Sequence, residues 1–242
     1  MDDLDRRVRK AVKHFWQVRD QQAANQGRTG QRDAGLRTAV TGGKHLDGFI
    51  ELCQSLLVES GLPEASVHCS GGLELPGYFR AEKKWDLLAI VDDELIAATE
   101  FKAQVGPSFG NNCNNRAEES VGSATDLWAA YREGAFKPSK RPWLGYLFLL
   151  EECPKSTAPI SVREPHFGVF SEFQGASYAK RYEILLTKLL RERLYDGACL
   201  LLSTRSGGLR GRYNTPSQEL DFRTFARSFM AHAIAFAKTR KA

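Results

Sequence analysis

One short stretch, residues 83–102, constrains the fold of this chain more than any other part of its sequence. Two apolar runs, residues 87–91 and 95–99, have the length and the aliphatic composition of β-strands. The acidic residues 92–94 between them are typical of a tight turn. The stretch therefore predicts an antiparallel hairpin whose turn centres on Asp93.

Charged side chains stand at the outer ends of these two strands. In the expected register, Asp86 faces Glu100 and Lys84 faces Lys102. Successive strand residues alternate faces, so Glu100 and Lys102 share one face and Asp86 joins them across the hairpin. Opposed residues place their Cβ atoms about 5 Å apart, close enough for two carboxylates to hold one divalent cation. Because two bare carboxylates at that distance repel each other, the sequence predicts a metal site beside an ammonium group.

A plainer alternative is that Glu100 and Lys102 form a solvated ion pair, which is a common arrangement on a strand. Two observations favour a functional site. Asp86 adds a second carboxylate across the hairpin, and all three charges adjoin runs that have the composition of buried strands. Charged groups in such surroundings need a partner or a function.

The hairpin resembles the Asp…Glu-x-Lys core of the PD-(D/E)XK nuclease superfamily, with Trp85 in place of the usual proline. A longer pattern is more specific: residues 85–88, 100–112 and 114–119 resemble the XhoI family of type II restriction endonucleases. This resemblance extends through essentially the whole chain. It implies a Mg²⁺-dependent endonuclease that cuts duplex DNA at the palindrome CTCGAG and leaves 5′ overhangs. It also implies a restriction–modification system, with a cognate DNA methyltransferase that protects the same site.

The same resemblance assigns roles to individual residues. Asp86 and Glu100 would bind the metal, while Lys102 would orient the attacking water or stabilise developing charge. In the superfamily a carboxylate from the helix before the sheet often reaches the metal, and Glu51 is the candidate here. The spacing fits a solvent-facing glutamate at this position equally well. Because a palindrome calls for a twofold protein, we expect a homodimer, and the aromatic helix at 219–240 is available for self-contact.

The expected elements agree with such a core. Apolar spacing predicts helices at 3–25, 44–60, 116–132, 177–194 and 219–240, and strands within 65–81, in the hairpin, at 143–150 and at 197–203. These elements predict an α/β (α+β) fold with a PD-(D/E)XK nuclease core, a central mixed sheet flanked by helices in αβββαβ order. Further helices are added at the N- and C-terminal ends.

A first candidate DNA-contacting segment is residues 105–115, whose glycines, prolines and asparagines are typical of a loop. Asparagine pairs bidentately with adenine in the major groove, and arginine does so with guanine. The candidate base-contacting residues are Asn111, Asn112, Asn114, Asn115 and Arg116. The alternative is that these asparagines only support turns and local hydrogen bonds.

Two further basic segments resemble loops. Residues 203–214 combine glycines with candidate phosphate or base contacts, namely Arg205, Arg210, Arg212 and Asn214. Their Gly-Gly-x-x-Gly pattern is a poor nucleotide-binding signal, because it follows a strand without opening a helix. Residues 27–32 are either a plain linker or a segment that becomes ordered on DNA.

Composition sets broader limits. The chain has 242 residues, 42% of them hydrophobic, which suffices for one domain over 1–242 with a catalytic core at about 44–150. The net charge of +5 permits a polyanionic partner. Five widely spaced cysteines without a Cys-x-x-Cys pair argue against a zinc site or a disulfide framework. The N-terminus has no apolar leader, and no apolar run is long enough to span a bilayer, so we expect a cytoplasmic bacterial enzyme.

Other chemistries have less support. The five histidines form no ligand pair at helical or strand spacing, and no Gly-x-Ser-x-Gly nucleophile motif or phosphate-cradling loop is present. Two rival functions remain: a DNA repair or resolvase-type nuclease that reads structure, and a non-catalytic DNA-binding protein with a nuclease fold. The asparagine-rich segment argues against the first, and the intact Asp86, Glu100 and Lys102 argue against the second.

Overall fold

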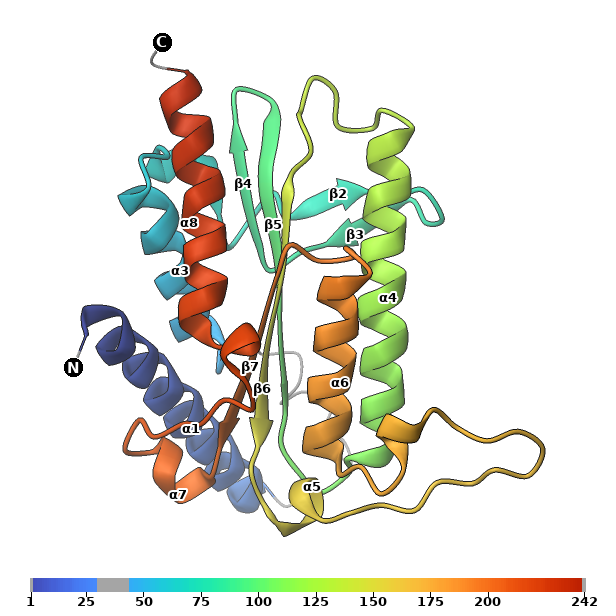
Figure 1. Cartoon of the computed structure of the whole chain (residues 1–242). Coiled ribbons are helices and arrows are strands. Elements are labelled where there is room, and N and C mark those ends of the chain that lie inside the picture. The colour runs from blue at the N-terminus through green and yellow to red at the C-terminus, as the bar shows by residue number, and fades with distance from the viewer. Residues whose placement is uncertain (1, 30–43, 241–242) are drawn as a thin grey trace.

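The computed structural model describes residues 2–29 and 44–240 and contains a five-stranded mixed sheet with helices on both faces (Figure 1). The strands lie in the order β1-β4-β5-β6-β7. Their bounds are β1 Val67–His68, β4 Leu87–Val91, β5 Glu94–Gln104, β6 Trp143–Glu151 and β7 Gly197–Ser203. This architecture is compatible with the expected α/β (α+β) fold and its PD-(D/E)XK core.

The sheet changes direction at β5. The strand β4 pairs antiparallel with β1 and β5, whereas β6 runs parallel to both β5 and β7. All of β6 except Glu151 is buried, which is the continuous apolar pattern of a parallel strand covered on both faces. The long helices are α1 Asp3–Thr29, α3 Asp47–Glu59, α4 Gly110–Arg132, α6 Tyr178–Arg191 and α8 Phe222–Thr239.

The helices cover the sheet in two layers. In Figure 1, α1, α3 and α8 lie on one side of the strands, and α4 and α6 lie on the other. Alternate side chains of β6 serve the two layers, because Leu147 and Leu149 join the core under α1, α3 and α8, and Tyr146 and Phe148 join the core under α4 and α6. The shorter elements are α5 Pro154–Thr157, α7 Arg205–Gly208, η1 Glu64–Ser66, η2 Ser171–Phe173 and η3 Gln218–Leu220.

The expected hairpin is present, and its register near the charged residues is confirmed. Leu87 pairs with Thr99 and Ala89 with Ala97, as expected. The expected turn centre is wrong: Asp92 and Asp93 alone form the turn, with left-handed φ values of 46° and 63°. Aspartate tolerates this conformation better than most residues. A register shift between Ala89 and Ile90 compensates for the shorter turn.

The strand that leads into the hairpin corrects a second expectation. Lys84 does not face Lys102, because it belongs to β3 (Glu82–Lys84), which pairs with β2 (Glu74–Pro76) in a separate two-stranded sheet. Lys84 lies opposite Glu74 there. Since strand side chains alternate, this pairing turns the neighbouring Lys83 toward the hairpin instead.

Residues 105–115 are not one loop, as the sequence predicted, because α4 begins at Gly110. Two buried side chains, Phe109 and Cys113, anchor its first turn in the core under α4 and α6. Asn112 donates a 2.7 Å hydrogen bond from Nδ2 to the carbonyl of Ser108. Tertiary packing therefore outweighs the low helix propensity of asparagine.

The segment 203–214 also contains helix, since α7 (Arg205–Gly208) follows β7 directly. Thr204 caps it, accepting a 3.0 Å hydrogen bond at Oγ1 from the amide of Gly207. The glycine pattern therefore does open a helix, although one of a single turn. The expected loop at 27–32 starts within α1, and its remainder lies outside the described residues.

The aromatic stripe of α8 is not available for self-contact in the way the sequence suggested. Phe222, Phe225 and Phe229 are each at most 2% exposed and pack into this chain's own core. All five cysteines are free in the structure. Within residues 2–29 and 44–240, no helix has the length and apolar character needed to cross a membrane.

Candidate active site

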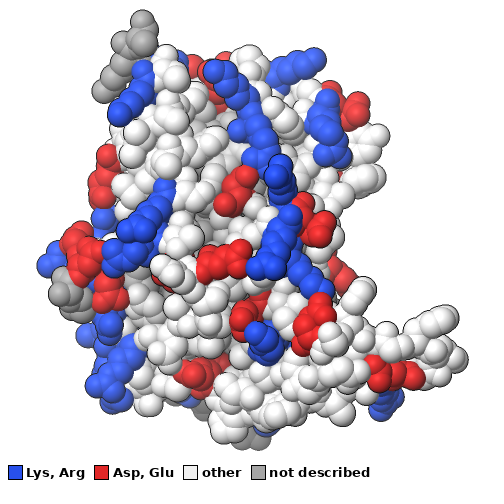
Figure 2. Space-filling view, viewed as in Figure 1, with Lys and Arg blue, Asp and Glu red and all other residues white. Residues whose placement is uncertain are grey.

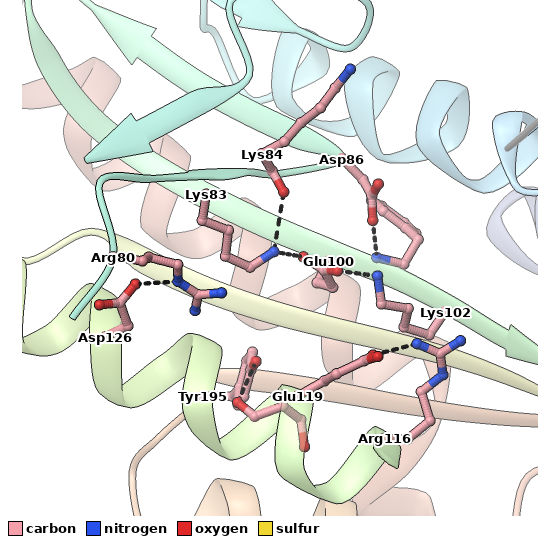
Figure 3. Close-up of polar contacts among 12 residues, drawn as sticks. Arg80, Lys83, Lys84, Asp86, Glu100, Lys102, Arg116, Glu119, Asp126 and Tyr195 are labelled. Atoms are coloured by element: carbon pink, nitrogen blue, oxygen red, sulfur yellow. Dashed lines mark hydrogen bonds and ion pairs between the residues drawn. The ribbon is translucent and has the colours of Figure 1, made fainter. Parts of the chain in front are cut away.

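Asp86 stands at the start of β4, between the two sheets (Figure 3). Its amide donates a 3.3 Å hydrogen bond to the carbonyl of Thr99. Its Oδ2 atom accepts a 2.7 Å hydrogen bond from the amide of Phe101. The carboxylate is therefore held against the part of β5 that carries Glu100 and Lys102, as the sequence predicted.

Glu100 is buried at the centre of the cluster, with 5% of the residue exposed. Lys102 contacts its Oε1 atom, and the Nζ atom of Lys83 lies 2.6 Å from its Oε2 atom (Figure 3). Each oxygen of this carboxylate thus faces an ammonium group. In the ion pair between Glu100 and Lys102 the glutamate is buried and the lysine is half-buried, so the pair is not the fully solvated one of the alternative prediction.

Burial and charge set the protonation states of the cluster. Burial, followed by the charge of Glu100, raises the pKa of Asp86. Burial alone would raise the pKa of Glu100, but the ammonium groups of Lys102 and Lys83 outweigh it and lower the pKa. Burial would lower the pKa of Lys102, but Glu100 and Asp86 outweigh it and raise the pKa. Lys102 is therefore a cation at neutral pH, and Glu100 is an anion.

Lys83 is a member of the cluster that the sequence reasoning missed. Its Nζ atom donates a 3.1 Å hydrogen bond to the carbonyl of Lys84 and lies 4.3 Å from the ring centroid of Trp85. The ring of Trp85 is fully buried and packs under this ammonium group. The available signal was a lysine close to the tryptophan that precedes Asp86, but its direction depends on the β2–β3 pairing.

A cavity of about 530 Å³ opens beside Asp86 and Lys102. Helix α1 and the turn that precedes α3 contribute its far wall, which includes Arg19, Gln22 and His45. Helix α4 contributes Asn112 and Arg116. The sequence did not predict that Arg19 and His45 lie near the hairpin, because both are distant from it along the chain.

The asparagine-rich segment meets this cavity only in part. Arg116 lines the cavity and pairs with Glu119 on α4 (Figure 3), and Asn112 lines it while bonded to Ser108. The other candidates, Asn111, Asn114 and Asn115, are exposed on the first two turns of α4. The structure therefore brings the start of α4 next to Asp86 and Lys102, with three further amide side chains exposed beside the cavity-lining pair.

The second basic segment lies near the α1 wall of the cavity. Arg205, Arg210, Arg212 and Asn214 are all exposed. Arg205 forms a 2.6 Å ion pair with Asp20 of α1, and Asn214 donates a 3.2 Å hydrogen bond to Glu152. On the face with α6 in front, Figure 2 shows a band of Lys and Arg side chains with acidic side chains along it, so the positive charge is not one uniform patch.

Glu51 is exposed on α3. Among the residues that the structure describes, no group of three or more His, Cys, Asp and Glu side chains is arranged to hold a metal. The structure therefore does not bring Glu51 together with Asp86 and Glu100. The two hairpin carboxylates still fit a hard cation, since Mg²⁺ takes oxygen ligands and commonly uses one or two carboxylates with several waters.

Comparison with known proteins identifies the family of this chain. The family model described as restriction endonuclease XhoI matches residues 25–215. The type II restriction enzyme BstVI of Geobacillus stearothermophilus is 53% identical over 206 residues, which cover 83% of this chain and 92% of that protein. The type II restriction enzyme XhoI of Xanthomonas vasicola is 44% identical over 190 residues, covering 78% and 76% of the two chains. AbrI of Azospirillum brasilense is 48% identical over 166 residues, covering 68% and 74%. No solved structure matches the chain.

Proposed function

Because this chain belongs to the XhoI restriction endonuclease family, and is thus a type II restriction endonuclease, we propose the details of its reaction. It makes Mg²⁺-dependent double-strand cuts at the palindrome CTCGAG and leaves 5′ overhangs. It acts in the bacterial cytoplasm, in a restriction–modification system whose methyltransferase protects the same site. The observation that carries the chemistry is the cluster of Asp86, Glu100 and Lys102 beside a cavity that α1 and α4 help to line.

Asp86 and Glu100 hold the cation in this proposal. Mg²⁺ bound there supplies charge stabilisation at the scissile phosphate and acidifies the attacking water. The amide of Phe101 keeps Asp86 in position, at a 2.7 Å hydrogen bond, so that little rearrangement is needed. Glu51 is the proposed further ligand only if α3 or the DNA brings it closer, since its side chain is exposed.

Lys102 acts as a cation in this proposal. The two carboxylates raise the pKa of Lys102, so its amine is already protonated at neutral pH and cannot act as a general base. A protonated lysine orients a water through its N–H groups or stabilises negative charge on the phosphate. The general base is then a water or a phosphate oxygen rather than Lys102.

DNA contacts are divided between two groups in this proposal. Arg116, half-buried on the cavity wall near Lys102, faces the phosphate backbone close to the cut. The exposed amides of Asn111, Asn114 and Asn115 extend from the first turns of α4 toward base edges, together with Asn112 at the cavity. The exposed Arg205, Arg210, Arg212 and Asn214 hold the backbone on the α1 side.

The proposed assembly is a homodimer, with one catalytic cluster for each strand of the palindrome. Analytical ultracentrifugation at micromolar concentration tests this assembly, and a monomer both with and without the duplex would contradict it. Structure-selective cleavage of the repair or resolvase type is the alternative activity, and a non-catalytic DNA-binding role is the alternative function. Membership of a restriction enzyme family disfavours both.

Digestion of a plasmid of known sequence in Mg²⁺ tests the proposal. Discrete fragments whose ends map to CTCGAG with 5′ overhangs are expected. Fragments that end at another sequence would leave the activity in place and overturn the site. A smear, or cutting only at junctions and mismatches, would instead favour a nuclease that reads DNA structure.

A further inference from the structure

Lys83 is held at the catalytic carboxylate from outside the hairpin. Its side chain is 12% exposed, its Nζ atom lies 2.6 Å from Oε2 of Glu100, and it also bonds the carbonyl of Lys84. The ring of Trp85 faces the same ammonium at 4.3 Å. Three groups therefore fix a lysine that comes from β3, in a sheet separate from the one that carries Glu100 and Lys102.

The cluster is electrically balanced without any added ion. Two carboxylates, Asp86 and Glu100, face two ammonium groups, those of Lys83 and Lys102. A divalent cation added to this balanced group meets two like charges in a partly buried site. A DNA phosphate that binds together with the cation supplies negative charge, which offsets the repulsion between the cation and the two ammonium groups.

The two lysines are not equivalent. Lys102 lines the cavity together with Asp86, where a substrate phosphate would enter. Lys83 is not among the residues that line the cavity, and it approaches Glu100 from the β2–β3 sheet. Lys102 is thus placed to act on the substrate, whereas Lys83 acts on the substrate only through Glu100.

We propose that Lys83 is a positioning residue that keeps the affinity of the free enzyme for divalent cations low, so that the catalytic cation binds tightly only once DNA phosphates are present. This inference rests on the proposed function, because it assigns the cation to Asp86 and Glu100. The consequence is an enzyme that gathers a complete catalytic site on its substrate rather than in solution.

A purely structural role for Lys83 makes a different prediction. If the lysine only neutralises the buried Glu100, its removal lowers stability and leaves a carboxylate that binds a cation no better. If it also opposes the cation, its removal raises the affinity of the free protein for that cation. Cation affinity therefore separates the two roles, whereas stability alone does not.

The experiment is calorimetric titration of the full-length protein with Ca²⁺, a hard cation with oxygen ligands, in buffer without Mg²⁺. Lys83→Gln and Lys83→Met remove the charge, and Lys83→Met keeps a stem that packs on Trp85. Lys84→Gln is the matched control, since Lys84 is the exposed neighbour on the same strand. Lys83→Arg keeps the charge and tests rescue.

In the absence of DNA, both charge-removing variants should bind Ca²⁺ about tenfold more tightly than the wild-type protein. The Lys84→Gln and Lys83→Arg variants should match the wild type. With a saturating CTCGAG duplex, all five proteins should agree within about threefold, because the phosphates offset Lys83. The wild type and the two variants that keep the charge, Lys84→Gln and Lys83→Arg, should each bind Ca²⁺ more tightly with the duplex than without it, by about tenfold or more.

Equal Ca²⁺ affinity of the free wild type and the charge-removing variants would overturn the inference while leaving the proposed cleavage untouched. If both charge-removing variants fail to fold, the wild-type protein provides the test. An equal affinity of the wild type for Ca²⁺ with and without the duplex would overturn the inference. Failure of the proposed function has another signature. Glu100→Gln would then bind Ca²⁺ as tightly as the wild type and would still cut in Mg²⁺.

Discussion

The amide of Phe101 donates a 2.7 Å hydrogen bond to Oδ2 of Asp86. This contact fixes the carboxylate of Asp86 to the strand that carries Glu100, so the spacing of the two acids follows from the hairpin itself. The neighbouring Leu87–Thr99 pair has the register that places Asp86 beside Glu100. The spacing of these two carboxylates is therefore a property of local β-pairing and depends little on the loops around them.

Asp126 should be important for stability. Its buried carboxylate accepts hydrogen bonds from the amides of Tyr78 and Phe79, at 2.8 and 2.7 Å, and from Arg80 at 2.7 Å. Asp126→Ala leaves these donors without their acceptor, and we expect a loss of about 2–4 kcal/mol in the free energy of unfolding. Urea unfolding measures this loss, with exposed Glu118→Ala on the same helix as the control. A loss no larger than that of the control would contradict the account.

Two glycines should respond in opposite directions to the same substitution. A Cβ atom at Gly208 would collide with the indole of Trp16, which is buried and donates a 3.0 Å hydrogen bond to Ser203. Gly208→Ala should therefore lower the free energy of unfolding by about 1–3 kcal/mol. At the exposed Gly122 in α4, a Cβ atom would meet nothing within 4 Å, so Gly122→Ala should raise stability by about 0.5–1 kcal/mol. Thermal unfolding of both variants measures these changes. Midpoint temperatures that shift in the same direction for the two variants would refute the packing argument.

Acid should destabilise the protein through His45. Burial, with smaller contributions from Arg19 and His14, lowers the pKa of His45 to about 4. The unfolded chain takes up this proton near pH 6.5. Between these values the unfolded state binds more protons, so this contribution to stability is complete above about pH 6.5 and is lost as the pH falls toward 4.

His45→Gln should therefore reduce the loss of stability between pH 6.5 and pH 4, as followed by urea midpoints across that window. The decline should not vanish, because burial also lowers the pKa of His232. His166→Gln, in an exposed segment, is the control and should leave the slope as it is in the wild type. A slope unchanged by His45→Gln would contradict this assignment.

Arg116 should contribute to DNA affinity more than to sequence choice. Its place on the cavity wall near Lys102 favours a phosphate contact. Arg116→Ala should then weaken binding to cognate and random duplexes alike and reduce the salt slope of binding by about one unit. Gel-shift titrations at several salt concentrations measure both quantities. Loss confined to the cognate duplex, by about 1–3 kcal/mol, would instead make Arg116 a base reader.

The hairpin that carries Asp86, Glu100 and Lys102 was predictable from the sequence because its pairing is local. Alternation with period two and a short turn specify which residues face each other, and the register error at Asp93 was absorbed by a bulge before it reached Asp86. The position of Lys84, which the sequence predicted to face Lys102, was wrong because it depends on a pairing between strands outside the hairpin. Lys84 pairs with Glu74 across β2 and β3, and no periodicity in residues 65–81 specifies that pairing.

The other features that the sequence did not predict also depend on contacts between elements distant in the chain. Helix α4 starts at Gly110 because Phe109 and Cys113 are buried against α6, a contact that the sequence of residues 105–115 does not reveal. The cavity wall formed by Arg19 and His45 depends on how α1 docks on the sheet. Local pairing was therefore visible in the sequence, whereas contacts between distant elements were not.

The most direct test of the central claim separates cleavage from binding at the hairpin. Asp86→Asn, Glu100→Gln and Lys102→Ala are assayed for cutting in Mg²⁺ and, in parallel, for gel-shift affinity on a duplex containing CTCGAG. All three should stop cleavage, since the first two remove cation ligands and the third removes the charge beside the phosphate. The two carboxylate variants should bind DNA at least as well as the wild type because they lose repulsion against phosphates, and Lys102→Ala should bind slightly less well. Cleavage by Glu100→Gln at close to the wild-type rate would show that the active site lies elsewhere.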